Sequence, residues 1–161
     1  MNEEADFKLV RNSTVGSELN EAKARLLAEK MGVRHLNDGE LLVKEGDTNH
    51  TLFVLVAGQL AVSSVDAIGE NHTIYTMKPG ECAGTRAFVE QSPRKATLRA
   101  VGATTVYTLT PGDFNTLLDE QPRVAFRVMQ ALFRVTHANL TRMNQESQEL
   151  ANYISKTNGR Y

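Results

Sequence analysis

The middle of the chain alternates short segments of apolar and β-branched residues with turn-forming residues. Turn signals stand at Asp38-Gly39, Gly46-Asp47, Ala57-Gly58, Gly69-Glu70, Pro79-Gly80, Ser92-Pro93 and Pro111-Gly112. Their spacing, mostly about 8–13 residues, is typical of an all-β sandwich or barrel. The pattern predicts strands over Thr51 to Val56, Leu60 to Val65, Ile74 to Met77, Ala96 to Val101 and Thr104 to Thr110, the first two forming a hairpin. Strands do not alternate with long helices as a parallel α/β sheet would require.

Helical patterns flank this β region on both sides. Apolar residues at helical spacing lie between Ser17, a suitable N-cap, and Gly32, and they predict a helix near Ser17 to Met31. Asp113 is a suitable N-cap for a short helix that ends near Glu120, and a long helix without glycine follows from Pro122 to Lys156. The chain therefore divides into an N-terminal segment with a short helix (1–35), a β domain (36–112) and C-terminal helices (113–161).

The long C-terminal helix carries an apolar stripe of coiled-coil spacing. Steps of three and four residues from Phe126 meet Met129, Phe133, Thr136, Leu140, Met143, Ser147, Leu150 and Ile154, of which Thr136 and Ser147 are polar. Packing on the β core is an equally good interpretation of Phe126 to Phe133, but it does not explain Leu140 to Ile154. We predict a homodimer whose seam is formed by Met129, Phe133, Leu140, Met143, Leu150 and Ile154.

Composition and charge narrow the class of protein. The chain has 161 residues, of which 41% are hydrophobic and 23% are charged, as in one ordinary globular domain. A formal net charge of −1 argues against a protein held to nucleic acid or acidic membrane mainly by bulk charge. A single cysteine, an acidic N-terminus and the lack of any stretch of about 20 apolar residues favour a cytoplasmic protein without a membrane segment.

Two segments carry a family resemblance. The chain reads VKEGDTNHTLFVLVAGQLAV from Val43 to Val62 and GECAGTRAFVEQSPRKATLRA from Gly80 to Ala100. Together they resemble the cyclic nucleotide-binding domain shared by bacterial catabolite activator proteins and by regulatory subunits of cyclic-AMP-dependent protein kinase. The resemblance extends from about Leu36 to the C-terminal helices and rests on E-G-D followed by P-R-x-A-T. It implies an eight-stranded jelly roll, or double-stranded β-helix, with a small-molecule pocket and helices that move or dimerise.

The resemblance also implies site residues. Arg94 would be the phosphate ligand, because a guanidinium offers a planar fork of donors to phosphate oxygens. Gly84 would open the short helix of the phosphate-binding cassette. Ala96 and Thr97 would line the strand beside the phosphate.

The cassette departs from the family pattern in ways that bear on the ligand. Thr85 stands where the family has a glutamate that accepts a hydrogen bond from the ribose 2′-hydroxyl. An alignment through Gly80-Glu81 would restore that glutamate, but it would require inserted residues before the cassette arginine. Arg86 stands where the family has an apolar residue and Lys95 where it has a small one, so the pocket mouth would hold extra cations.

The sequence gives less support to other classes of function. A metal-dependent cupin enzyme would pair histidines on one strand, but His35, His50, His72 and His137 are scattered, so we predict no metal site. No catalytic set is suggested by a local motif, and we predict that the chain is not an enzyme. A bacterial activator would add a helix-turn-helix after the long helix, but the chain ends at Tyr161, so direct DNA binding is not expected.

The sequence as a whole predicts a cytoplasmic sensor that binds a small cyclic nucleotide. The ligand would be cAMP, cGMP or a cyclic dinucleotide, and the C-terminal helix would relay its binding to an unknown protein effector. Two alternatives remain open: a degenerate domain that acts as a ligand-free dimeric adaptor, and the sensor half of a truncated transcription regulator.

Overall fold

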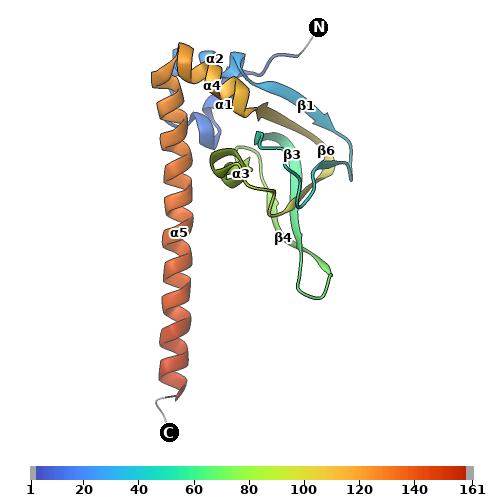
Figure 1. The fold of residues 1–161 in the computed structure, drawn as a ribbon, viewed down its shortest axis with the longest axis vertical. Coiled ribbons are helices and arrows are strands. Elements are labelled where there is room, and N and C mark those ends of the chain that lie inside the picture. Colours follow the sequence, from blue (N-terminus) through green and yellow to red (C-terminus); the bar gives the residue numbers. More distant parts are fainter. Residues whose placement is uncertain (1–2, 159–161) are drawn as a thin grey trace.

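The strands form one antiparallel sheet that curls into a roll (Figure 1). The structure, a computed structural model, describes residues 3–158. Its strands are β1 (Gly32–Leu36), β2 (Leu41–Val43), β3 (Leu52–Val65), β4 (Asn71–Met77), β5 (Cys82–Ala83) and β6 (Thr97–Leu109). The order in the sheet is β1-β6-β3-β4, with β2 paired to β6 and β5 paired to β3. The predicted fold, mainly β with flanking helices and built as a jelly roll, is confirmed.

The predicted hairpin between Thr51 and Val65 is wrong, because β3 runs through this whole stretch as one strand. Gly58 lies inside the strand with φ +83°, where the sheet register shifts, and a Cβ at this position would lie 2.4 Å from the carbonyl oxygen of Ala103. Glycine therefore marks a bulge here and not a turn. The two segments predicted between Ala96 and Thr110 likewise form the single strand β6. Its first half pairs with β2 and its second half with β1.

Helices precede and follow the strands in the sequence, and one short helix lies between β5 and β6. They are α1 (Phe7–Arg11), the 3-10 helix η1 (Thr14–Gly16), α2 (Glu21–Glu29), α3 (Thr85–Glu90), α4 (Pro111–Glu120) and α5 (Pro122–Asn158). The predicted caps Ser17 and Asp113 are wrong. Asn20 caps α2 by accepting the backbone N–H of Lys23 at 2.9 Å, and Thr110 caps α4 by accepting the backbone N–H of Asp113 at 3.0 Å. Both predicted helices otherwise exist with shifted ends.

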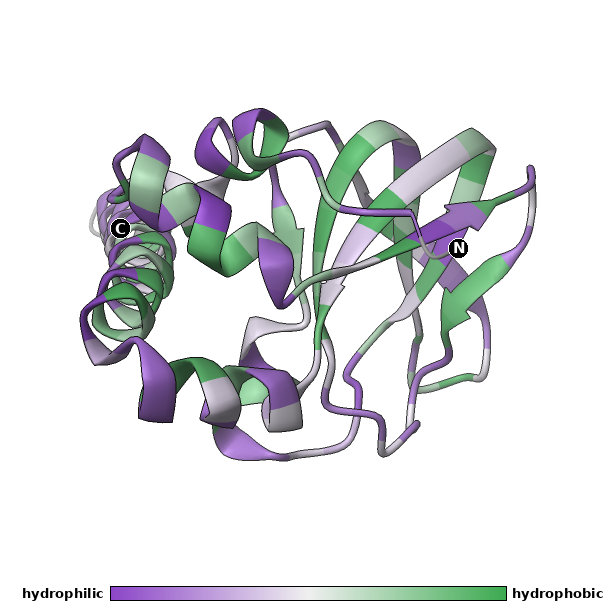
Figure 2. Cartoon of the chain, turned by 90° about the horizontal axis from the view of Figure 1, so that it is seen from above, coloured by the Kyte–Doolittle hydropathy of each residue, from purple (hydrophilic) through white to green (hydrophobic). Residues whose placement is uncertain are grey.

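Two apolar cores hold these layers together. The core inside the roll consists of Leu36, Leu42, Val43, Phe53, Leu55, Leu60, Met77, Leu98, Ala100 and Val106. The second core joins the helices to one end of the roll, and the start of α5 contributes Val124, Ala125, Val128 and Leu132 to it. Seen from above, the helices gather on one side of the strands (Figure 2). This second core fixes where α5 leaves the domain.

The second half of α5 projects beyond the roll (Figure 1). From Phe133 to Lys156 every residue of the helix is exposed. Phe133, Leu140, Met143, Leu150 and Ile154 are 49–70% exposed, whereas Met129 is half-buried against the second core. Most of the predicted seam is thus an apolar stripe on a free helix. No helix within residues 3–158 is long and apolar enough to span a bilayer.

Candidate ligand-binding site

A cavity of about 780 Å³ opens between the roll, α3 and α5. Its apolar lining includes Val43, Val62, Met77 and Leu98 from the core inside the roll. Six of the predicted binding residues also line it, namely Gly84, Thr85, Arg86, Arg94, Lys95 and Ala96. Thr97, the seventh, is not among the lining residues, and its hydroxyl accepts the backbone N–H of Glu45 at 3.0 Å. The fold thus combines an apolar wall with a group of cationic and polar side chains.

Arg94 is the buried cation of this cavity, with only 5% of its surface exposed. Its Nη2 donates to the carbonyl oxygen of Thr51 at 2.6 Å, and its guanidinium lies over the ring of Phe53 at 5.2 Å from the centroid. Its Nε and Nη1 are buried and have no hydrogen-bond partner among residues 3–158. Since buried charged groups are normally paired, these two donors indicate a place for an anion.

The backbone around Arg94 is held by the turn that precedes β3. The N–H of Gly46 donates to the carbonyl oxygen of Arg94 at 2.8 Å, and the N–H of Arg94 donates to the carbonyl oxygen of Asp47 at 2.9 Å. Burial lowers the pKa of Arg94, and the negative charge of Asp47 opposes this change. An arginine side chain still keeps its charge at neutral pH. The site therefore offers a fixed cation.

Gly84 lets the guanidinium approach the start of α3. Its φ is +85°, and a Cβ built on it would lie 2.2 Å from Nη1 of Arg94. A side chain at this position would therefore collide with the guanidinium and strain the backbone. Glycine is required here both for its conformation and for the space it leaves.

The structure places Thr85 and Glu81 at different points of the cavity lining. Thr85 is the first residue of α3, and its hydroxyl lies 3.7 Å from the sulfur of Cys82. Glu81 lies before β5 and accepts the hydroxyl of Tyr75 at 2.5 Å, a bond that raises the pKa of that tyrosine. The start of α3 therefore carries no carboxylate, whereas Glu81 brings one to another part of the lining.

The helix α5 supplies cavity residues that sequence reasoning missed. Val135, Asn139 and Arg142 line the cavity, at a spacing of four and three residues that puts them on one face of the helix. That spacing was a readable signal, but nothing in the sequence indicated that this face lines a cavity together with the roll. Arg86 lines the same cavity but is paired with Glu90, with 3.0 Å between Nε and Oε2.

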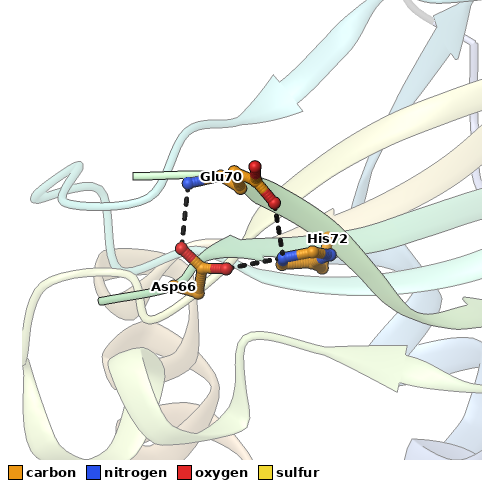
Figure 3. Close-up of side chains that lie close together, drawn as sticks. All are labelled: Asp66, Glu70 and His72. Atoms are coloured by element: carbon orange, nitrogen blue, oxygen red, sulfur yellow. Dashed lines mark hydrogen bonds and ion pairs between the residues drawn. The ribbon is translucent and has the colours of Figure 1, made fainter. Parts of the chain in front are cut away.

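A group of metal-ligating residue types lies outside this cavity, at the turn between β3 and β4 (Figure 3). It consists of the exposed residues Asp66, Glu70 and His72. Asp66 accepts the backbone N–H of Glu70 at 2.9 Å, and this bond lowers the pKa of its carboxyl group. His72 lies 2.6 Å from the other oxygen of Asp66. These contacts close the turn, as Asp commonly does in such positions.

Comparison with known proteins places the chain in a family. The family described as cyclic nucleotide-binding domain matches residues 33–121, more than half of the chain. The chain belongs to this family. The matched segment contains all of β1 but its first residue, β2 to β6, α3 and α4, and it therefore includes the cassette with Arg94.

Individual members of the cyclic nucleotide-binding domain family support this assignment. A cAMP-dependent protein kinase regulatory subunit from Dictyostelium discoideum is 28% identical over 94 residues, which cover 56% of this chain and 29% of that protein. A cyclic nucleotide-binding domain from Methylobacillus flagellatus has the same fold, with a TM-score of 0.80 at 18% identity over 91% of this chain and 86% of that chain. The regulatory domain of Toxoplasma gondii PKA with cAMP gives 0.62 at 25% identity, over 68% and 42% of the two chains. The chain spans less than a third of the length of the curated relatives it matches first.

Proposed function

We propose that the chain is a non-enzymatic sensor that binds a cyclic nucleotide, with Arg94 as the ligand of the phosphate. The observation that carries this proposal is the buried guanidinium, whose Nε and Nη1 have no partner among the described residues. A cyclic phosphate would supply charged acceptors to both nitrogens, as bidentate arginine sites do. The apolar wall beside it suits a base and a sugar face.

The contact between the cavity and α5 supports a relay through this helix. Val135, Asn139 and Arg142 belong to the same helix as the exposed stripe at Leu140 and Leu150. A ligand that contacts the cavity-lining residues of α5 would stabilise one position of this helix over others. The position of the helix in turn determines how the apolar stripe is presented to a partner. Dimerisation through the stripe and an unknown protein effector complete the proposed function.

A ligand-free dimeric adaptor is the second candidate, and Thr85 is the observation that favours it. A threonine at the start of α3 cannot provide the carboxylate that the family uses for the ribose. The two candidates differ in one measurable property, because an adaptor has no affinity for nucleotides while a sensor does.

Calorimetric titration with cAMP and cGMP separates these functions. The sensor is expected to bind at least one of them, and Arg94→Gln is expected to weaken binding by about tenfold or more, since hydrogen bonds to charged groups contribute about 1.5–3 kcal/mol. Arg99→Gln is the matched control, because Arg99 is exposed on β6 and does not line the cavity. Unchanged affinity in Arg94→Gln would place the phosphate elsewhere. A folded wild-type chain that binds no nucleotide would support the adaptor.

A further inference from the structure

The cavity lining has an excess of positive charge. The ionisable side chains that line it and carry a charge at neutral pH are Arg86, Arg94, Lys95 and Arg142 against the single carboxylate of Glu81. The ion pair with Glu90 neutralises Arg86. The carboxylate of Glu81 already accepts the hydroxyl of Tyr75 and the backbone N–H of Lys78, the latter at 3.3 Å. Three cationic side chains remain without an ion pair within the part of the chain that the structure describes.

These three cations come from different parts of the fold. Arg94 lies deep in the cavity, and the exposed Lys95 follows it in the chain at the cavity edge. Arg142 comes from α5, which follows the cassette in the sequence, and it lines the same cavity. Its charge reaches the rim of the roll, since it lowers the pKa of Tyr75 against the larger effect of Glu81. Positive charge is therefore present at the bottom of the cavity and at its mouth.

One phosphate cannot compensate both positions. A 3′,5′-cyclic mononucleotide carries a single negative charge, and the unpartnered nitrogens of Arg94 would take it. Lys95 and Arg142 would then stay uncompensated around the same cavity, where like charges repel each other. The volume of about 780 Å³ is in the upper part of the range of about 300–1,000 Å³ that is usual for small-molecule sites. The cavity has room for a second anionic group.

We infer that the ligand is a nucleotide with two separate phosphate groups, one bound by Arg94 and the other by Arg142 together with Lys95. This inference rests on the phosphate site at Arg94 in the proposed function and specifies the ligand class of that site. Two kinds of compound share this chemistry: a cyclic dinucleotide, which has two phosphodiesters in one ring, and a nucleoside bisphosphate. In either, the second phosphate connects the roll to α5.

Titration of the full chain with cyclic di-AMP, cyclic di-GMP, adenosine 3′,5′-bisphosphate and cAMP tests the inference. At least one ligand with two phosphates is expected to bind about tenfold or more tightly than cAMP, as one added charge-assisted contact predicts. If the cyclic dinucleotides bind more tightly than the bisphosphate, the second phosphate belongs to a cyclic dinucleotide; if the bisphosphate binds more tightly, it belongs to a nucleoside bisphosphate. Its affinity should also fall more steeply with added salt than that of cAMP, because exposed charges are screened.

Arg142→Gln is the decisive variant, and Arg123→Gln is its control on the same helix. Both arginines are exposed, and Arg123 does not line this cavity. Arg142→Gln should weaken the ligand with two phosphates about tenfold or more beyond any change in cAMP affinity, so that the preference for two phosphates is lost, while Arg123→Gln should leave the preference intact. Equal weakening of all ligands by Arg142→Gln, or tightest binding of cAMP to the wild type, would overturn the inference. If cAMP alone binds and depends on Arg94, the inference fails while the proposed function stands; if no nucleotide binds, both fail.

Discussion

Arg94 is buried although its Nε and Nη1 atoms have no hydrogen-bond partner among the described residues. Leaving a buried charged donor unsatisfied costs about 1–3 kcal/mol or more, so a side chain without a function would be expected to find a partner or to reach solvent. The carbonyl oxygen of Thr51, the ring of Phe53 and the charge of Asp47 compensate part of this cost. An anion in the cavity would compensate the rest, which is why this residue carries the proposed function.

Gly84→Ala is expected to weaken ligand binding by about tenfold or more, because the new Cβ would displace the guanidinium that makes a charge-assisted contact. Gly39→Ala is the matched control. Gly39 has a similar φ of +79° but no atom within 4 Å of the added Cβ. Both variants should lose about 1 kcal/mol of folding stability through backbone strain, and only Gly84→Ala should lose affinity in calorimetry. Equal affinities in the two variants would refute the collision as the cause.

Thr85→Glu is expected to tighten cAMP binding about 10- to 100-fold, because a carboxylate that accepts the ribose 2′-hydroxyl contributes about 1.5–3 kcal/mol. The measurement is calorimetric titration of wild type and variant. Glu81→Gln, tested beside it, reports whether the carboxylate at Glu81 already serves the ligand. If Thr85→Glu leaves cAMP binding unchanged while Glu81→Gln weakens it, the family glutamate has its counterpart at Glu81 and not at position 85.

Cys82 provides a chemical probe of the same cavity, which it lines. Burial raises the pKa of its thiol, while the nearby hydroxyl of Thr85 opposes this change. The thiolate is the nucleophile, so alkylation at about pH 8 should be slower than for a free cysteine and should accelerate as the pH increases. A bound nucleotide should slow alkylation further, as measured by mass spectrometry. Alkylation that is as fast as for an unfolded control would contradict the burial of this side chain.

At the scale of elements, the sequence predicted the existence of most helices and strands better than their ends. The hairpin prediction failed at Gly58, because a glycine in a strand bulge has the same sequence signature as a glycine in a turn. The caps failed because Ser17 and Asn20 are both good caps and only packing selects between them. The motif led to six residues that line the cavity, whereas Thr97, predicted from the same motif, does not line it. Arg142 was not predictable, because a helical periodicity does not state which partner each face meets.

The helix α5 combines two environments. Its start is anchored by Val128 and Leu132 in the second core, whereas the exposed part from Phe133 to Lys156 is about 36 Å long at about 1.5 Å per residue. Helices in proteins gain most of their stability from packing an apolar face, so the exposed apolar stripe favours association with a second copy. The flanking heptad positions Gln130, Leu132, His137, Asn139, Asn144, Glu146, Ala151 and Tyr153 include one carboxylate and no lysine or arginine. Charge at these positions would therefore not oppose a homodimer.

Replacing Leu140 and Leu150 together with Asp is expected to convert a dimer into monomers, because it puts charges in the middle of the apolar stripe. Sedimentation at micromolar concentration measures this. The matched control is Ala138→Asp with Asn152→Asp, which adds the same charge to the opposite face of the helix. A wild-type chain that already sediments as a monomer, or a control that dissociates equally, would show that the stripe is not the seam.

At the scale of the whole molecule, the cavity lies between the roll and α5. Arg94 and Gly84 belong to the roll and its cassette, while Asn139 and Arg142 belong to the helix that carries the predicted seam. A ligand that fills this cavity would contact both parts at once. Binding of the ligand and association of α5 are therefore expected to be thermodynamically linked.

This linkage predicts that the monomeric variant with Leu140→Asp and Leu150→Asp binds ligand more weakly than the wild type, although neither residue lines the cavity. In a monomer the projecting helix frays, so ligand binding must also order Asn139 and Arg142, and the entropy lost lowers the affinity. In a dimer these residues are already ordered before the ligand binds. A coupling of about 1–2 kcal/mol corresponds to an affinity lower by about 5- to 30-fold. Reciprocity requires that the ligand tighten dimerisation of the wild type by a comparable factor, which sedimentation with and without ligand measures. Equal ligand affinity in the dimer and the monomer would show that α5 does not transmit binding, and the relay in the proposed function would have to be abandoned while the site at Arg94 remained.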